Sequence, residues 1–136
     1  MLEALSIFGR RAINDQPLII FGDGTQQRSF TSVKDIAAIN MLVASSDKTK
    51  GEVFNCASGI KVTILELAQK VLSALDKKHL EIRYEEWTPG DIKVFDVENE
   101  KIRRLGIEFN TNFDDGLADT LKWLVEYFEK QGAEKC

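Results

Sequence analysis

Short apolar segments bounded by Pro and Gly constrain the fold of this 136-residue chain more than any other feature of its sequence. Pro17 opens an apolar run at residues 18–21, and a Gly-Asp-Gly turn follows that run. Four apolar residues between such breakers are typical of a short buried β-strand. Residues 28–31 resemble a strand that returns after the turn, so the sequence predicts a β-hairpin over residues 18–31.

Helical stripes of apolar residues separate the predicted strands. Apolar residues recur at a spacing of three and four in residues 2–14, 33–46 and 64–75, and again in a stretch that begins near Asp114. This spacing places one apolar face on each helix and predicts that the face is buried against a neighbour.

Capping side chains mark the start of two of these helices. Ser32 precedes Asp35 by three residues, and Thr63 precedes Glu66 by the same distance. Thr with Glu at this spacing forms a capping box, in which each side chain accepts a hydrogen bond from the other residue's backbone N–H. The sequence therefore predicts helix starts directly after Ser32 and Thr63.

The remaining segments complete a mixed α/β pattern. Strands are predicted at residues 52–56 and 80–87, and a short helix is expected between Asp96, as its cap, and Gly106. The expected order is helix, strand, strand, helix, strand, helix, strand, helix, helix. Strands separated by helices indicate mixed α/β layers, and the scarcity of Pro and Gly inside the segments favours one continuous unit over residues 1–136.

Charge and hydropathy exclude two classes of partner. Twenty-two acidic and eighteen basic side chains give a net charge of −4, which argues against a surface that binds nucleic acid. No apolar run approaches the roughly 18 residues that a membrane span needs. A basic segment followed by an apolar one is also missing at the N-terminus, so we expect no signal peptide and a cytoplasmic protein.

Histidine and cysteine are too few for the usual zinc sites. The only histidine is His79, and the only cysteines are Cys56 and Cys136. Zinc sites of the usual type use several such residues close together, so we expect no metal site. His79 follows two lysines in a polar turn and is interpreted as a solvated loop residue. Two unpaired thiols fit a reducing compartment.

The sequence predicts no catalytic residue. Its nine glycines form neither a G-x-G-x-x-G motif nor a phosphate-binding P-loop. Neither tyrosine, Tyr84 or Tyr127, has a lysine four residues later. The carboxylate pairs at residues 85–86 and 114–115 are interpreted as a solvated strand edge and a helix start, where negative charge is stabilising.

Six segments nevertheless follow one another in the order and spacing of a known family. The first is PLIIFGDGTQQRSFTSVKDIA, and it is followed by GEVFNCASG, VTILELAQKV, TPGD, a short helix ending in Leu-Gly, and DGLADTLKWL. Together they resemble the extended short-chain dehydrogenases/reductases that act on nucleotide sugars, namely UDP-glucose 4-epimerases and dTDP-glucose 4,6-dehydratases. The resemblance covers essentially the whole chain.

The resemblance implies a C-terminal, substrate-binding part of such an enzyme, without a complete Rossmann domain. The family's N-terminal part carries the Gly-rich NAD loop and a Tyr-x-x-x-Lys pair, so this chain alone is expected to bind no NAD and to be inactive. It would be a piece of a longer protein or a shortened gene product. The implied enzyme is an NAD-dependent 4-epimerase of a UDP-hexose. The alternatives are a 4,6-dehydratase or a stand-alone, non-catalytic module that binds nucleotide sugars.

Arg28 is the first substrate-binding residue that the resemblance implies. It stands where the family has a phosphate-binding arginine, and a planar guanidinium suits diphosphate oxygens. Without the resemblance, a surface ion pair with Asp23 or Asp35 would be the simpler interpretation. Ser29 departs from the family, which usually has Asp after this arginine.

Asp91 is the second implied binding residue, in a loop that matches the family's Arg-x-Gly-Asp. Its carboxylate would accept hydrogen bonds from both ribose hydroxyls, which predicts a preference for UDP over dTDP. Thr88 occupies the position of the family's second phosphate-binding arginine. This replacement removes one charge-assisted contact, worth about 1.5–3 kcal/mol.

Ile19, Phe21 and Asn55 complete the implied site. The backbone of Ile19 and Phe21 would pair with the edge of a uracil or thymine base, while their side chains are expected in the core. Asn55 matches an asparagine that reaches a phosphate in the family. The equally weighted alternative is a strand-end asparagine bonded to its own backbone.

The resemblance also implies unpartnered surfaces. The helices at residues 2–14 and 33–46 would each pack one apolar face on a sheet that this chain lacks. Exposed apolar patches of several hundred Å² usually find a partner. The chain is therefore expected to self-associate, to exchange elements between copies, or to pair with an NAD-binding half.

Overall fold

A computed structural model describes residues 3–87, 89–94 and 96–133 of the chain. Helices and strands are interspersed along these residues, which confirms the mixed α/β prediction. The elements are α1 (Glu3–Ile13), β1 (Leu18–Phe21), β2 (Gln27–Phe30), α2 (Val33–Ala44), the short 3₁₀ helix η1 (Asp47–Thr49), β3 (Ile60–Thr63), α3 (Ile64–Ala74), β4 (Ile82–Glu85), α4 (Glu100–Arg103) and α5 (Phe113–Ala133).

The strands pair in two separate two-stranded sheets, so the predicted hairpin over residues 18–31 is wrong. β1 is parallel to β4, and β2 is antiparallel to β3. The backbone N–H groups of Leu18 and Gly22 donate to carbonyls of Glu81 and Glu85, both at 2.9 Å. β1 therefore takes β4 as its partner along one edge, and β2 takes β3.

The predicted strand at residues 52–56 is also wrong. This segment forms no ladder, and the strand that pairs with β2 begins only at Ile60. Ser58 explains the offset, because its hydroxyl donates to the carbonyl of Phe30 and accepts from the N–H of Ile60 at 3.0 Å. Its own N–H donates to the Thr31 hydroxyl at 3.0 Å. Side-chain hydrogen bonds thus connect the end of β2 to residues 58–60, next to the point where the ladder between β2 and β3 begins.

The capping box at α3 is confirmed. The N–H of Glu66 donates to the Thr63 hydroxyl at 3.1 Å, and the N–H of Thr63 donates to the Glu66 carboxylate at 2.9 Å. At α2, Ser32 is the N-cap and accepts from the N–H of Lys34 at 3.2 Å. Asp35 does not complete a box there, because its buried carboxylate binds the segment before α5.

The short helix expected after Asp96 is displaced by a few residues. α4 begins at Glu100, with Asn99 as the N-cap residue, and Gly106 lies just beyond its end with a φ of +76°. Asp96 instead forms an ion pair with Lys61 on β3, with 2.6 Å between nitrogen and oxygen. Because its carboxylate is engaged across the chain, Asp96 is unavailable as a helix cap.

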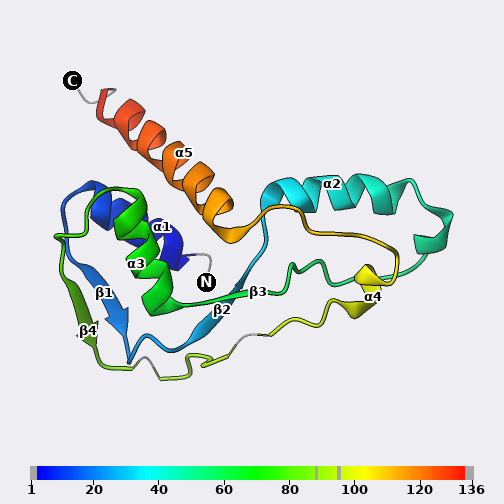
Figure 1. Ribbon diagram of the computed structural model, residues 1–136, viewed down its shortest axis with the longest axis horizontal. Coiled ribbons are helices and arrows are strands. Elements are labelled where there is room, and N and C mark those ends of the chain that lie inside the picture. Colours follow the sequence, from blue (N-terminus) through cyan, green and yellow to red (C-terminus); the bar gives the residue numbers. More distant parts are fainter. Residues whose placement is uncertain (1–2, 88, 95, 134–136) are drawn as a thin grey trace.

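Two apolar clusters form the core. The larger one joins one face each of α1, α3 and α5 to the buried side of β1, and its buried members include Phe8, Leu18, Ile20, Leu67, Val71 and Leu121. The smaller one is built on Ile39, Ile102 and Ile107. Figure 1 shows the same division: α1, α3, β1 and β4 lie at one end, and α2, η1 and α4 at the other.

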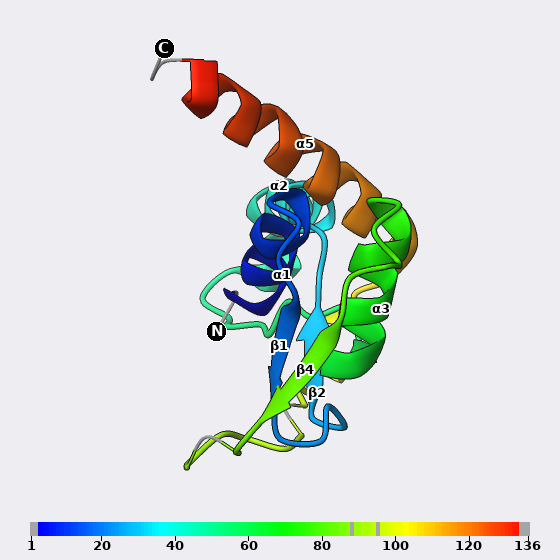
Figure 2. The same ribbon diagram turned by 90° about the vertical axis from the view of Figure 1, so that its left-hand side faces the viewer.

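Two helices present apolar side chains to solvent. On α2, Val33, Met41 and Leu42 are 78%, 73% and 57% exposed. α5 extends away from the rest of the molecule toward its C-terminal end (Figures 1 and 2), and Trp123 and Tyr127 stack on its exposed side. No helix in the described residues is both long and apolar enough to cross a membrane.

Candidate functional site

Arg28 and Asp91, 63 positions apart in the sequence, meet in one ion pair. The Nη2 atom of Arg28 lies 2.6 Å from Oδ1 of Asp91, and the two side chains are only 12% and 24% exposed. Nη1 of Arg28 also donates to the backbone carbonyls of Ile92 at 2.7 Å and Gln27 at 2.8 Å. The structure therefore brings together two residues that the sequence singled out separately.

These contacts fix the orientation of the guanidinium. Arginine has five N–H donors in a rigid fork, and the described residues accept from three of them in Arg28. The Nε hydrogen and the second Nη2 hydrogen have no acceptor among these residues. A cation that is held in place and retains two donors is preorganised for an oxyanion.

The simpler pairing of Arg28 with Asp23 or Asp35 is wrong. Asp23 accepts from the N–H and the hydroxyl of Thr25, at 2.9 and 2.6 Å. These hydrogen bonds hold the pKa of Asp23 below its ordinary value, and the bond from the Thr25 hydroxyl has the larger effect. Asp35 accepts from the N–H of Thr111 at 3.1 Å. Both carboxylates thus accept hydrogen bonds from groups other than Arg28.

The segment that carries Asp91 lies alongside the start of β2. The N–H of Gln27 donates to the carbonyl of Lys93 at 2.8 Å, and Gln27 forms a parallel bridge with Val94. The Arg28 contacts to Asp91 and Ile92 extend this attachment by two residues. Backbone pairing and the guanidinium together hold residues 91–94 beside β2.

Trp87 and Gln26 shape the site but were missed in the sequence. A Cβ atom on Gly22 would lie 2.1 Å from Cε3 of Trp87, so the indole packs directly on the glycine backbone. Gln26 is 3% exposed, and its Nε2 donates to the carbonyl of Phe21 at 2.7 Å. The Gly-Asp-Gly turn is the only local signal for either role, because it permits this close approach.

Ile19 and Phe21 lie on the side of β1 that faces away from the larger core cluster. Successive side chains of a strand point in opposite directions, and Leu18 and Ile20 occupy the buried side with exposed fractions of 0% and 1%. Ile19 is half-buried, and Phe21 is 47% exposed. The expectation that Phe21 belongs to the core is therefore wrong.

Asn55 lies in another part of the structure. It is exposed between Phe54 and Cys56, which pack against the smaller core cluster. Burial, with a further contribution from the charge of Asp35, raises the pKa of the Cys56 thiol. The structure does not place Asn55 at a strand end. Thr88 lies outside the described residues.

The residues present do not fit a dinucleotide cradle. Such a cradle needs a glycine-rich turn that leads from a strand into the N-terminus of a helix. Here the Gly-Asp-Gly turn after β1 leads into β2. β3 does lead directly into α3, but that junction is closed by the Thr63–Glu66 capping box, which places a carboxylate where a diphosphate would bind.

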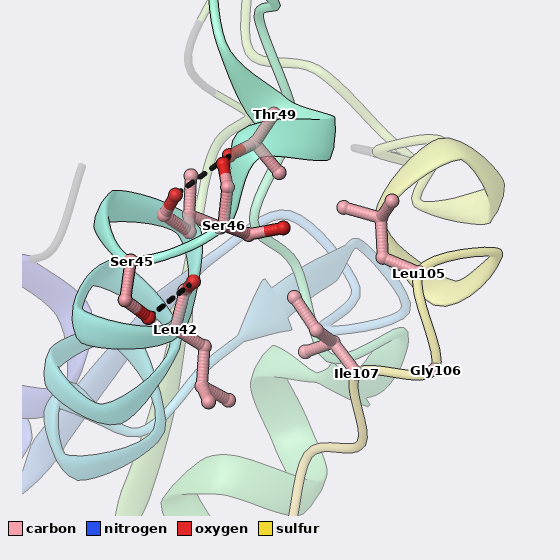
Figure 3. A pocket seen from close by; sticks show the side chains of 8 residues that line it. Leu42, Ser45, Ser46, Thr49, Leu105, Gly106 and Ile107 are labelled. Atoms are coloured by element: carbon pink, nitrogen blue, oxygen red, sulfur yellow. Dashed lines mark hydrogen bonds between the residues drawn. The ribbon is translucent and has the colours of Figure 1, made fainter.

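A separate cavity of about 320 Å³ lies between the end of α2 and residues 105–107 (Figure 3). The hydroxyl of Ser45 donates to the carbonyl of Leu42 at 3.1 Å, and that of Thr49 donates to the carbonyl of Val43 at 2.6 Å. These hydroxyls therefore donate hydrogen bonds to carbonyl groups in the last turn of α2. The lining residues include no charged side chain, so the cavity does not suit a phosphate.

Comparisons with known proteins identify the family. Residues 3–57 match the NAD dependent epimerase/dehydratase family. The low-salt glycan biosynthesis protein Agl12 of Haloferax volcanii is 32% identical over 111 residues, which are 81% of this chain and 35% of the relative. Other relatives include a dTDP-glucose 4,6-dehydratase and a UDP-glucuronate 4-epimerase.

Solved structures agree with this match. An epimerase from Methanothermobacter thermautotrophicus superposes with a TM-score of 0.84 at 30% identity, over 93% of this chain and 38% of that structure. The UDP-glucuronic acid 4-epimerase from Bacillus cereus, solved with UDP-glucuronic acid and NAD, gives a TM-score of 0.77 at 27% identity. That match covers 89% of this chain and 40% of the epimerase.

The match is extensive on this chain and partial on its relatives. The chain spans 35% of the Haloferax protein and 38% and 40% of the two solved structures. The fold, the sequence identity and the family match agree with the resemblance noted in the sequence. The chain belongs to the NAD dependent epimerase/dehydratase family and corresponds to part of an extended short-chain dehydrogenase/reductase.

Proposed function

We propose that this chain is the nucleotide-sugar-binding part of an NAD-dependent 4-epimerase that acts on a UDP-hexose in the cytoplasm. The observation that carries the proposal is the contact between Arg28 and Asp91. A guanidinium suits a diphosphate, and a carboxylate suits hydroxyl donors. A nucleoside diphosphate presents these two kinds of group next to each other. Binding energy from this remote part of the substrate would hold the sugar in place for chemistry elsewhere.

The backbone of β1 supports the proposed position of the base. Leu18 and Gly22 use their N–H groups toward β4. In a parallel pair, successive residues direct their peptide groups to opposite edges of the strand, so those of Ile19 and Phe21 face away from β4. The carbonyl of Phe21 is occupied by Gln26. The peptide groups of Ile19 are therefore the better candidates for pairing with a uracil edge.

Calorimetric titration of UDP-glucose and UDP into the purified chain tests the proposal. We expect binding by the wild type and its loss in Arg28→Ala. Lys61→Ala is the matched control, because Lys61 lies on the neighbouring strand, opposite Ser29, and contributes a more exposed cation. Equal binding by wild type and Arg28→Ala, or no binding by the folded wild type, would contradict the proposal.

A competition between UDP and dTDP separates the epimerase proposal from its main alternative. The dTDP-glucose 4,6-dehydratase of Streptomyces niveus is 28% identical to this chain, so that activity is the second candidate. Only the ribose of UDP offers Asp91 a 2′-hydroxyl donor. We expect UDP to bind more tightly, while equal or tighter binding of dTDP would favour the dehydratase.

Catalysis would need a second part that supplies NAD and the proton-transferring residue. We propose that this chain pairs with such an NAD-binding half. Mixing the chain with the N-terminal half of a close relative, in the presence of NAD and UDP-glucose, should produce the epimerised sugar. A mixture that forms a stable complex and binds UDP-glucose but leaves the sugar unchanged would favour a non-catalytic binding module.

A further inference from the structure

Asp91 binds the guanidinium of Arg28, which is the group that the proposed function assigns to the diphosphate. Its Oδ1 atom lies 2.6 Å from Nη2 of Arg28, and both side chains are largely shielded from solvent. A diphosphate is an anion, as Asp91 is, and both are attracted to the same guanidinium. An incoming ligand must therefore displace the carboxylate or tolerate a like charge beside it. The following inference rests on the proposed function and deepens it.

The other contacts of Arg28 do not compete with a ligand. Nη1 donates to the carbonyls of Gln27 and Ile92, which are neutral and belong to the backbone. These bonds can persist while Nη2 exchanges one anion for another. Asp91 is therefore the single charged group among the described contacts of Arg28 whose departure would open the site.

The fate of the displaced carboxylate decides which ligands can enter. Asp91 is 24% exposed in the ion pair, and a half-buried charge without a partner is unfavourable. Inorganic pyrophosphate brings only anionic oxygens and offers the carboxylate nothing in return. A diphosphate with adjacent hydroxyl groups supplies donors that replace the lost N–H.

We propose that Asp91 is an internal competitor for Arg28 and makes the site selective for diphosphates that carry neighbouring hydroxyl donors. In the unliganded protein it neutralises the guanidinium. A bare diphosphate must overcome that pairing without compensation. A nucleoside diphosphate compensates it through the sugar hydroxyls. The same carboxylate thus weakens the binding of a bare diphosphate and permits the binding of a nucleoside diphosphate.

Affinities for inorganic pyrophosphate and UDP in three proteins test this proposal. The proteins are the wild type, Asp91→Asn and the matched control Asp96→Asn, which removes the same charge from the more exposed ion pair with Lys61. We expect Asp91→Asn to bind pyrophosphate about tenfold more tightly and UDP no more tightly than the wild type. The preference for UDP would then shrink by at least that factor, while Asp96→Asn would keep it.

The outcomes separate this proposal from the function on which it rests. Pyrophosphate affinity that is unchanged or weaker in a folded Asp91→Asn protein overturns the competitor role, and UDP binding that depends on Arg28 would still support the proposed function. If neither ligand binds the wild type or the variant, both proposals fall. Asp91→Ser, a second substitution that removes the charge, must reproduce the gain in pyrophosphate affinity.

Discussion

Asp35 shows how one buried carboxylate can join two distant segments. It lies in the first turn of α2 and is 7% exposed. It accepts from the N–H groups of Asn110 and Thr111 at 3.2 and 3.1 Å, and from the Thr111 hydroxyl at 3.1 Å. The segment before α5 is thereby attached to the start of α2.

Replacement of Asp35 by Ala should destabilise the chain strongly. The substitution removes the acceptor of the half-buried Thr111 N–H and of the exposed Asn110 N–H, and one unsatisfied buried group costs about 1–3 kcal/mol. We expect a loss of about 1–3 kcal/mol in the free energy of unfolding, measured by urea denaturation. Asp47→Ala, an exposed carboxylate near the other end of α2, should change it little. A similar small effect for both variants would contradict this account.

Gly22 is constrained both by its backbone conformation and by a neighbouring side chain. Its φ is +81°, and an added Cβ would collide with Trp87 at 2.1 Å. Gly22→Ala should therefore destabilise through both backbone strain and steric conflict, by about 1–3 kcal/mol. Trp87→Ala removes the indole and so relieves the steric conflict but not the backbone strain. The double variant Gly22→Ala/Trp87→Ala should therefore lose less stability than the sum of the losses in the two single variants. Additive losses in thermal unfolding would show that the indole does not pack on Gly22.

A capping box decides where α3 begins. Thr63 accepts from the N–H of Glu66 and is the first half of the capping box. Thr63→Ala removes this acceptor and should lower the free energy of unfolding by about 0.5–2 kcal/mol. Thr63→Ser keeps the hydroxyl and should retain most of the stability. Equal losses in the two variants would count against the capping role.

The second half of the box is sensitive to pH. Hydrogen bonds from the N–H and hydroxyl of Thr63 lower the pKa of Glu66. A carboxyl whose pKa is lower in the folded state contributes stability above its unfolded pKa and loses it as pH falls through the folded pKa. The stability difference between wild type and Glu66→Ala should thus be largest near neutral pH and shrink in acid. A difference that stays constant down to pH 3 would contradict the hydrogen bonds.

The starts of α2 and α3 could be predicted from the sequence because their causes are local. Ser32 and Thr63 act within three residues of themselves, and the apolar spacing of each helix is read over one or two turns. Strand pairing is not local. β1 pairs with β4 across more than 60 residues, and nothing within residues 18–31 distinguishes that partner from a hairpin partner. β3 begins later than predicted, after the hydrogen bond from the Ser58 hydroxyl to Phe30. The spacing of apolar residues gives no sign of such a bond.

The candidate site was predictable only in part, for the same reason. The resemblance singled out Arg28 and Asp91 separately, from short motifs. Their contact depends on the way residues 91–94 lie beside β2, which follows from long-range backbone pairing. Trp87 and Gln26 have no motif of their own, because Trp87 acts through packing on Gly22 and Gln26 through a hydrogen bond to the carbonyl of Phe21.

For the whole molecule, the exposed apolar side chains of α2 predict self-association of the isolated chain. Val33, Met41 and Leu42 are all more than half exposed, and such patches usually find a partner. Light scattering at high concentration should show particles larger than a monomer. Met41→Glu together with Leu42→Glu should shift them toward the monomer, whereas Val53→Glu, an equally exposed site outside α2, should not. A clean wild-type monomer would contradict this prediction.

The parallel pairing of β1 with β4 has a consequence for how the chain is made. During synthesis, residues 18–21 leave the ribosome long before residues 82–85, which supply their hydrogen-bonding partners. Until then β1 presents an unpaired edge, and such edges invite pairing with other chains. A nascent chain ending before residue 85 should therefore depend on chaperones, because neither β4 nor the α5 members of the larger core cluster have yet been made.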